Sequence, residues 1–345
     1  MSEPMNVAVV LGGTNEERNV SLATGRAVVA ALREQGHEIV AVDPAHGAVL
    51  PEEEARMLGG AVGADPPGIE ELARLGSSAV GAALADLPAV RRADVVFLAL
   101  HGEFGEDGTV QGLLDLAGVA YTGSGCLGSA VAFDKRISKE LFAFAGVPTP
   151  EWTRASATPG EIVEELGLPL VVKPASGGST VGLTVVRAED DVESAIELAA
   201  RYDDDVLCEA FIPGRELTVA VLEGEALPPV EIIPSHEIYD YECKYSAGMS
   251  RYEAPADLSP VETERLQDLA VRAYRALRQT SYSRVDFRRA ENGSFWCLEA
   301  NSLPGLTSTS LVPKAVAAAG ITFPELCERI VRSAVSRANH GSERG

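Results

Sequence analysis

A carboxylate, an amide and a run of hydroxyls stand close together near the C-terminal end, where residues 297–314 read CLEANSLPGLTSTSLVPK. Glu299 and Asn301 share one face of a short predicted strand, because side chains alternate between the two faces of a strand. Magnesium in proteins prefers a few carboxylate or carbonyl oxygens together with substrate phosphates. The pattern is therefore typical of a metal held against phosphates, although a polar strand end that enters a turn has the same composition.

A predicted hairpin brings a second carboxylate to this patch. Asn292-Gly293 is the strongest short hairpin signal and predicts a two-residue loop. In that register Asp286 lies opposite Glu299, and Arg284 lies opposite Asn301. Like charges opposite each other destabilise a bare sheet, and a bound cation would remove that cost. The register therefore predicts a metal-binding patch, with a solvated strand face as the alternative.

Lys173 ends another predicted strand and is followed by the loop PASGGSTVG. A glycine-rich loop can bring backbone N–H groups close to phosphate oxygens. The loop is not a Walker A motif, because it lacks Gly-Lys-Ser/Thr and no helix follows it directly. Together with the lysine it indicates a phosphate-binding loop, and an ordinary Gly/Ser-rich hairpin loop is the alternative.

Lys135 follows Asp134, which can cap a helix that ends at Gly146. A cation in the first turn of a helix opposes the helix dipole unless an anion lies nearby. Taken alone, this segment favours a solvated lysine on an exposed first turn over a phosphate-binding residue.

One motif points to a different chemistry. Residues 123–128 read GSGCLG, which matches GxGxxG and follows a short predicted strand over 119–121. A dinucleotide site places this motif after the first strand of the sheet, with an acidic residue about twenty positions later. Here the first strand lies far away, and Ala145-Gly146 at the end of a helix stands in the acidic position. We therefore expect no nicotinamide or flavin cofactor.

The elements that must position these residues fall into two groups. The first group alternates strands with a helix, which predicts a parallel sheet with crossover helices. Ser21 at the start of its helix and Gly36 just past the end fit helix caps. After about residue 150, predicted strands dominate and some of them pair as hairpins. The predicted strands cover 6–11, 39–42, 94–100, 170–173, 183–187, 206–211, 216–222, 227–233, 281–290 and 294–300; the predicted helices cover 21–35, 191–201, about twenty residues from 260, 311–319 and 324–337.

Composition limits the function classes. A length of 345 residues suggests two or three domains, and a net charge of −22 argues against a nucleic-acid partner, because phosphate backbones attract Lys and Arg. No stretch of eighteen apolar residues and no secretory pattern is present, so we expect neither a membrane span nor export. The five cysteines form no CxxC pair, which predicts reduced thiols in a cytosol rather than disulfides or a zinc site; they are residues 126, 208, 243, 297 and 327.

Taken together, several stretches resemble D-alanine–D-alanine ligases, members of the ATP-grasp superfamily, over about residues 6–330. They occur in the family's order: LGGTNEERNVSL, HGEFGEDGTVQGLL, YTGSG, the Asp-Lys pair at 134–135, VVKPASGGSTVG, RELTVAVL, YDYECKY, RVDF and LEANSLPGLTSTSLVP. The resemblance implies an α/β ATP-grasp fold of three domains, with ATP between the second and third. The three implied domains are a parallel α/β domain over 1–133, a small central α+β domain over 134–215, and an α+β domain with an antiparallel sheet over 216–345.

The resemblance also implies roles for the polar residues on the nucleotide side. Lys135 and Lys173 match lysines that contact the phosphates of ATP, and Glu209 and Glu216 match residues that hold adenine and ribose. Lys244 matches a lysine on a mobile loop that closes over ATP. The metal ligands that match are Asp286, Glu299 and Asn301, for two magnesium or manganese ions.

On the amino-acid side, the resemblance implies that Glu17 receives the ammonium group of the first D-alanine. Ser179 and Tyr245 match its hydrogen-bonding partners, and His101 matches a residue near this substrate. The remaining matches are Arg284 and the N–H of Gly305 for the oxyanion, and Ser310 and Leu311 for the carboxylate of the second substrate. Helix capping by Glu17 and Ser21, a structural His101 and a plain loop aromatic at Tyr245 are the alternatives.

The implied activity is joining two D-alanine molecules through an acyl phosphate, for peptidoglycan, in a cytoplasmic homodimer. A ligase of D-alanine with D-lactate or D-serine, a ligase of secondary metabolism and a non-catalytic paralogue are the competing hypotheses. The resemblance implies that Tyr245 favours the dipeptide, because relatives that form depsipeptides differ in that loop. Two features depart from the family pattern: Asn19 stands where an acidic residue is usual, and the segment between Asp43 and Asp94 is longer, which predicts added helices away from the reaction.

Overall fold

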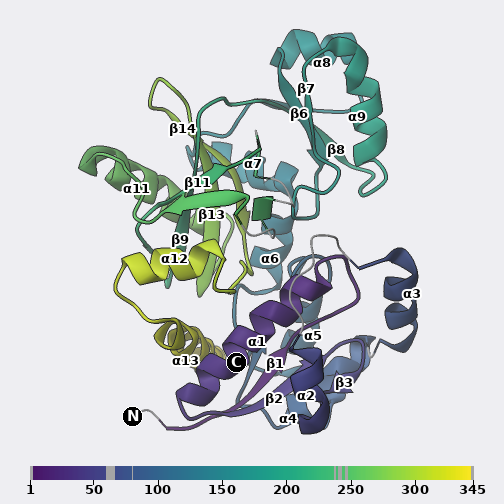
Figure 1. Cartoon of the computed structure of the whole chain (residues 1–345), viewed down its shortest axis with the longest axis vertical. Coiled ribbons are helices and arrows are strands. Elements are labelled where there is room, and N and C mark those ends of the chain that lie inside the picture. The colour runs from purple at the N-terminus through teal and green to yellow at the C-terminus, as the bar shows by residue number, and fades with distance from the viewer. Residues whose placement is uncertain are drawn as a thin grey trace.

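The computed structural model describes residues 3–59, 67–79, 81–236, 238–239, 243–244 and 248–342. In these residues the strands form three sheets. Figure 1 shows the parallel sheet at the bottom, the largest sheet at the left centre, and a small sheet with its helices at the upper right. The predicted α/β architecture is confirmed, and the three domain boundaries remain a prediction.

The first sheet has the order β3-β2-β1-β4. Strands β1 (Asn6–Val10), β2 (Glu38–Asp43) and β4 (Val95–Leu98) are parallel, as predicted, and β3 (Gly47–Ala48) adds an antiparallel edge. All four residues of β4 are buried, as expected for a parallel strand covered on both faces. Helix α1 (Arg18–Glu34) is the crossover from β1 to β2.

Helix α1 begins three residues earlier than predicted, so the assignment of Ser21 as its cap is wrong. The buried Ser21 hydroxyl instead accepts a hydrogen bond from Gly12 N at 2.8 Å and donates one to Ala99 O at 2.7 Å. It therefore ties the turn after β1 to the end of β4. Glu17 occupies the N-cap position, but its side chain makes no capping hydrogen bond.

The long segment before β4 folds into the added helices that the sequence predicts, and none of its described residues lines the clefts discussed below. The GxGxxG match also has a packing explanation. Gly128 lies so close to Arg278 that an added Cβ would be 2.7 Å from the Arg278 carbonyl oxygen. The helices before β4 are α2 (Pro51–Met57), α3 (Ile69–Ser78), η1 (Gly81–Asp86) and α4 (Pro88–Arg91), and those after it are α5 (Thr109–Ala117) and α6 (Cys126–Phe133).

The small sheet is antiparallel, with the order β5-β8-β6-β7. Its apolar face packs against α8 and α9 around Ile162, Val172 and Cys208. The predicted strands and the helix α9 are confirmed within two residues, whereas β5 and α8 were not predicted. The elements are β5 (Trp152–Arg154), α8 (Pro159–Leu166), β6 (Leu170–Pro174), β7 (Thr184–Val186), η2 (Glu189–Asp191), α9 (Val192–Ala199) and β8 (Val206–Ala210).

The largest sheet is also antiparallel, with the order β12-β11-β9-β13-β14 and β10 paired to β9. Helices α7 and α11 pack on one face through Phe142 and Leu266, and α12 packs on the other face through Val312. The elements are α7 (Lys135–Phe144), β9 (Arg215–Leu222), β10 (Glu225–Ala226), β11 (Val230–Pro234), β12 (Ser250–Glu253), α11 (Pro260–Ala276), β13 (Tyr282–Arg289), β14 (Phe295–Asn301) and α12 (Leu311–Ala318).

The β13–β14 hairpin corrects one prediction and keeps its consequence. The loop has three residues, not two, because Ala290 N donates to Ser294 O at 2.9 Å and Gly293 adopts φ of +81°. This shifts the pairing near the turn by one residue. A bulge after Asp286 shifts it back, so Asp286 faces Glu299 as predicted.

The last helix, α13 (Phe323–Ser342), returns to the first sheet and lies beside α1 (Figure 1). Arg332 donates to Glu3 O at 2.7 Å, and His37 is hydrogen-bonded to Glu328. The C-terminal part of the chain therefore closes the hydrophobic core of the N-terminal part. Over the residues that the structure describes, none of the helices combines the length and the apolar character that crossing a membrane requires.

Candidate active site

Two adjoining clefts contain the predicted site residues. The lysine cleft lies between the small sheet and the largest sheet and is lined by Lys135, Lys173, Glu209, Glu216, Asp286 and Arg288, among others. The serine cleft is lined by Glu17, His101, Asn301, Gly305, Ser310 and Leu311, among others. Ser179, Lys244, Arg284 and Glu299 line both clefts. A ligand in one cleft would therefore meet a ligand in the other beside Arg284 and Glu299.

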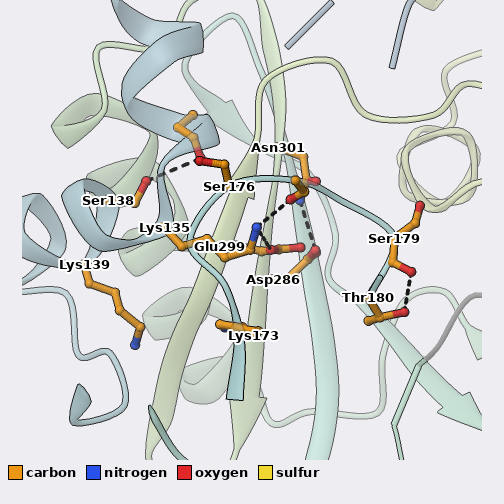
Figure 2. A network of polar contacts seen from close by, with 12 residues as sticks. Lys135, Ser138, Lys139, Lys173, Ser176, Ser179, Thr180, Asp286, Glu299 and Asn301 are labelled. Carbon is orange, nitrogen blue, oxygen red and sulfur yellow. Dashed lines mark hydrogen bonds and ion pairs between the residues drawn. The ribbon is translucent and has the colours of Figure 1, made fainter. Parts of the chain in front are cut away.

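Lys135 is not the exposed lysine that its segment suggested. Asp134 caps α7 by accepting from Ile137 N, as predicted, but the Lys135 side chain is only 11 % exposed. Its ammonium donates to Gly177 O at 2.6 Å and lies 3.7 Å from Glu299 Oε2 (Figure 2). Burial lowers the pKa of Lys135. The lysine thus links the glycine-rich loop to Glu299, one of the predicted metal ligands.

Glu209 is buried between two lysines. Its Oε1 accepts from Lys173 at 2.5 Å, and its Oε2 lies 2.9 Å from the ammonium of Lys139. Burial favours the neutral acid, but the two ammonium groups outweigh it and lower the pKa of Glu209. The carboxylate is therefore held in its ionised form at the base of the lysine cleft.

Glu216 and Lys244 also line the lysine cleft. Arg288 lies 3.2 Å from Glu216 and also donates to Ile212 O at 3.0 Å. Burial raises the pKa of Glu216, although Arg288 opposes this effect. The ammonium of Lys244 lies 5.5 Å from the centre of the Tyr239 ring.

The three side chains predicted to bind a metal come together as the hairpin register predicts. Asp286 accepts from Arg284 Nη2 at 2.7 Å, from Thr218 Oγ1 at 2.6 Å and from Asn301 Nδ2 at 3.1 Å. Figure 2 shows Asp286, Glu299 and Asn301 converging on one side of the sheet, with Lys135 beside Glu299. The two carboxylates and the amide would bind a cation here through oxygen atoms, which are the ligands that magnesium and manganese prefer.

The bulge in β14 changes which side chains reach the clefts. Leu298 is the extra residue between the Glu299 and Cys297 pairs. As a result, Leu298 and Glu299 both line the lysine cleft, although they are adjacent in a strand. Bulges often re-aim side chains in this way next to active sites.

The electrostatic field keeps Glu299 ionised. Burial alone would raise its pKa, but Lys135, Lys244 and Lys173 outweigh burial and lower it to about 2. In the part of the chain that the structure describes, no group of three or more His, Cys, Asp and Glu side chains surrounds one point. A cation held by two carboxylates and an amide would therefore need further oxygens from a ligand, which suits magnesium bound with phosphates.

In the serine cleft, Glu17 accepts a hydrogen bond from a residue that is distant in sequence. Ser179 Oγ donates to Glu17 Oε1 at 2.6 Å and so joins the glycine-rich loop to the start of α1. Ser179 and Thr180 have φ of 52° and 60°, a left-handed conformation that is rare for residues with a side chain. Such conformations persist where the surroundings fix them, commonly at ligand sites. The geometry thus joins the predicted pair of Glu17 and Ser179.

His101 is buried and fully bonded. Its Nε2 lies 2.9 Å from Thr24 Oγ1, and its Nδ1 lies 3.0 Å from Leu303 O and 3.5 Å from Glu106 Oε1. Burial lowers the pKa of His101, but the contact with Glu106 outweighs it and raises the pKa. Burial also raises the pKa of Glu106. His101 therefore has the structural contacts of the alternative interpretation while it also lines the serine cleft.

The hydroxyl-rich turn after Gly305 closes on itself. Ser310 Oγ accepts from Thr307 N at 3.1 Å and lies 2.8 Å from Thr307 Oγ1. Leu311 begins α12, and Ser310 and Leu311 both line the serine cleft, so the N-terminus of this helix lies at the cleft. Helix N-termini attract anions such as carboxylates.

The sequence did not reveal some residues of the site, and one predicted residue lies outside the part of the chain that the structure describes. Glu106 stands within the HGEFGEDGT stretch, but its pairing with His101 requires the tertiary fold; Lys139 and Arg288 carry no motif of their own. Tyr245 lies outside the described residues. Asn19 lies on α1 and lines neither cleft.

The arrangement suits a reaction between a polyphosphate and a small zwitterion. The lysine cleft offers two ammonium groups beside a glycine-rich loop, which fits phosphates. The serine cleft offers a carboxylate for a cationic group and a helix N-terminus for an anionic one. Arg284, shared by both clefts, could stabilise negative charge where the two ligands meet.

Comparisons with known proteins agree over nearly the whole chain. The family model "D-ala D-ala ligase N-terminus" matches residues 6–124, and "D-ala D-ala ligase C-terminus" matches residues 137–332. The D-alanine--D-alanine ligase of Gloeobacter violaceus is 43% identical over 334 residues, which are 95% of this chain and 98% of the relative.

Two solved structures extend the comparison. The D-alanine--D-alanine ligase from Bacillus anthracis complexed with ATP has 31% identity and a TM-score of 0.76, covering 99% of this chain and 100% of the other. The VanG D-Ala:D-Ser ligase from Enterococcus faecalis has 28% identity and a TM-score of 0.79, covering 96% of this chain and 100% of the other.

Proposed function

The chain belongs to the D-alanine–D-alanine ligase family, and we propose that it uses ATP to join two D-alanine molecules into a dipeptide for peptidoglycan synthesis. One observation supports the location of the reaction in the structure: the lysine cleft and the serine cleft meet at Arg284 and Glu299. ATP occupies the lysine cleft, and the two amino acids occupy the serine cleft.

The reaction follows from the electrophile that is needed. A carboxylate is a poor electrophile, so an oxygen of the first D-alanine carboxylate attacks the γ-phosphorus of ATP, and ADP leaves. The amine of the second D-alanine then attacks the carbonyl carbon of this acyl phosphate and loses a proton. The tetrahedral intermediate expels inorganic phosphate, and the peptide bond remains.

On the nucleotide side, Lys135 and Lys173 bind the phosphates, and Glu209 and Glu216 hold adenine and ribose. The support is that all four side chains line the lysine cleft. Lys244 lines both clefts, which fits a residue that closes over the reacting phosphate. Closure would exclude water and protect the acyl phosphate from hydrolysis.

Asp286, Glu299 and Asn301 would hold two magnesium or manganese ions together with the phosphates. The oxygen-only donor set and the ionised Glu299 support this assignment. Bound divalent cations would neutralise the phosphate charge that otherwise repels an attacking carboxylate. Arg284 lies beside this patch, because it donates a hydrogen bond to Asp286 at 2.7 Å.

Glu17 binds the ammonium group of the first D-alanine, and Ser179 holds Glu17 in place. His101, bonded to Leu303 O, lies beside this substrate. Arg284 and Gly305 N stabilise the oxyanion of the tetrahedral intermediate, usually a large contribution to catalysis. Ser310 and Leu311, at the start of α12, bind the carboxylate of the second D-alanine.

The Glu17→Gln variant is expected to raise the KM for the first D-alanine by about 10- to 100-fold, because a hydrogen bond to a charged group contributes roughly 1.5–3 kcal/mol. Initial rates at saturating ATP, over a range of D-alanine concentrations, measure this value. The neighbouring exposed Glu16→Gln is the matched control. Equal KM values in the two variants would exclude the role of Glu17.

The lowered pKa of Lys135 predicts an early alkaline loss of ATP affinity. The protonated form binds phosphate, and burial moves its deprotonation below the ordinary value of 10.5. Affinity should therefore fall as pH rises through this lowered pKa, and it should fall later in Lys135→Arg, since guanidinium stays charged.

Calorimetry without D-alanine measures this affinity across pH. Burial also lowers the pKa of Lys314, which does not line the lysine cleft, so Lys314→Arg is the control and should leave the wild-type profile unchanged. An unshifted alkaline limb in Lys135→Arg would contradict the assignment.

The second substrate distinguishes the remaining candidates. D-Serine deserves a direct comparison, because the fold also matches a D-Ala:D-Ser ligase. ADP release is measured with D-alanine alone and with D-alanine plus D-serine or D-lactate, and the products are identified by mass. We expect D-alanyl-D-alanine as the main product in each mixture. A main product containing serine or lactate would reassign the second substrate, and ADP release with none of them would exclude this ligase activity.

We also propose that the enzyme acts in the cytoplasm as a homodimer. None of the five cysteines forms a disulfide, which fits a reducing compartment. Leu116, Leu127 and Phe144 are highly exposed on α5, α6 and α7, which fits a covered apolar surface. Light scattering of the purified chain tests the dimer, and a monomer mass would contradict it.

A further inference from the structure

Lys139 is a cation without access to water or to either cleft. It lies on α7 with no exposed surface, and its ammonium donates to Thr149 Oγ1 at 2.8 Å and to Pro150 O at 3.0 Å. Burying an ammonium group is unfavourable unless it is paired. Its ionic partner is Glu209, whose Oε2 lies 2.9 Å away.

The two lysines on Glu209 are not equivalent. Lys173 lies on β6, lines the lysine cleft and bonds Oε1, whereas Lys139 contacts Oε2 from the protein interior. Among the described residues, no donor makes a well-aligned hydrogen bond to Oε2. The contact with Lys139 is therefore an ion pair that acts through charge.

We expect the two ion pairs to respond differently to a nucleotide. The phosphates of ATP carry several negative charges and attract Lys173, the ammonium group that faces the cleft. Lys139 cannot follow, because Thr149 and Pro150 hold it in the interior. After nucleotide binding, Glu209 therefore depends on Lys139 as its counter-ion. A buried carboxylate without a counter-ion takes up a proton.

We propose that Lys139 is a positioning residue that keeps Glu209 ionised and oriented, and that it thereby makes the enzyme select adenine over guanine nucleotides. This inference rests on the proposed role of Glu209 at adenine. An ionised carboxylate only accepts hydrogen bonds. Adenine presents an amino group at the edge where guanine presents a carbonyl oxygen. A charged Glu209 attracts the first and repels the second, whereas a protonated one can donate to guanine.

The Lys139→Met variant tests this proposal through the ratio of kcat/KM for ATP to kcat/KM for GTP. We expect the ratio to fall at least tenfold, mainly because the KM for ATP rises. Lys314→Met removes a lysine that is only partly buried and lies outside the lysine cleft, and it should keep the wild-type ratio. A purely structural role of Lys139 would lower both values of kcat/KM equally, and an unchanged ratio would overturn the proposal.

A second comparison separates a direct effect from poor folding. In a Glu209→Gln background the carboxylate is absent, so adding Lys139→Met should leave the ATP-to-GTP ratio unchanged. A further fall in the ratio would overturn the proposal, because Lys139 would then act without Glu209. This double variant removes both charges of the Lys139–Glu209 pair, and the remaining Lys173 lines the cleft, where the phosphates can pair with it, so the variant decides the question even if Lys139→Met alone fails to fold. A wild-type enzyme without preference for ATP over GTP would also overturn the inference, whereas a wild type that forms no dipeptide with either nucleotide would overturn the proposed function.

Discussion

Replacing Glu299 with glutamine is expected to lower kcat by about a thousandfold and leave the fold intact. Glu299 is the ionised carboxylate at the junction of the two clefts, and Lys135 lies 3.7 Å from it. The amide keeps the size of the side chain but removes the charge that would hold a divalent cation against the phosphates. Electrostatic contributions of this kind reach about 10²–10³ in kcat for a single group.

Steady-state ADP release measures this effect, and a thermal melt reports the fold. Glu223→Gln is the matched control, because Glu223 is a partly exposed carboxylate that pairs with Arg329 at 2.6 Å, outside both clefts. This control should keep nearly all activity. If Glu299→Gln stays within tenfold of wild type while folded, the metal assignment is wrong.

The second large effect is expected from Arg284→Lys. Lysine keeps the positive charge but loses the forked guanidinium that bonds Asp286 through two nitrogens. We expect kcat to fall by roughly a hundredfold, with the KM for ATP changed by less than about threefold, since the lost stabilisation belongs to the oxyanion of the transition state.

Arg289→Lys provides the comparison on the same strand. Arg289 lies at the far end of β13 and bonds Glu262 at 2.5 Å, so its variant should retain the wild-type kcat. Equal losses in the two variants would indicate a general effect on β13. An Arg284→Lys variant with the wild-type kcat would exclude the oxyanion role.

The β13–β14 hairpin shows how far the sequence could predict the site. Asn292-Gly293 identified the turn, but the loop has three residues and the pairing near it is shifted. The prediction for Asp286 and Glu299 was still correct, because a bulge in β14 shifts the pairing back. Nothing in the local sequence marks this bulge. It reflects the cleft, which receives Leu298 and Glu299 together.

Local signals failed where a side chain serves a distant contact. Ser21 fits a helix cap by type and position, yet its hydroxyl bonds Gly12 and Ala99 instead. Lys135 fits an exposed first turn, yet the glycine-rich loop covers it. In both cases tertiary packing overrides a local preference that contributes about 1 kcal/mol or less.

Two of the missed residues act through a partner that is remote in sequence: Lys139 pairs with Glu209, and Arg288 pairs with Glu216. Glu106 lies only five positions after His101, but no motif marks the contact between the two buried side chains. A motif shows which residue types occur together in order. It does not show which side chain will be the counter-ion of a buried charged residue such as Lys139, because that depends on how α7 packs against the sheets.

The most direct test of the central claim follows oxygen atoms. The enzyme is given ATP and D-alanine with both carboxylate oxygens replaced by ¹⁸O, and the inorganic phosphate is analysed by mass. If the carboxylate attacks the γ-phosphorus where the two clefts meet, each dipeptide formed releases one phosphate that carries one ¹⁸O atom. Dipeptide accompanied by unlabelled phosphate would contradict the acyl phosphate, and with it the assignment of phosphoryl transfer to the junction at Arg284 and Glu299.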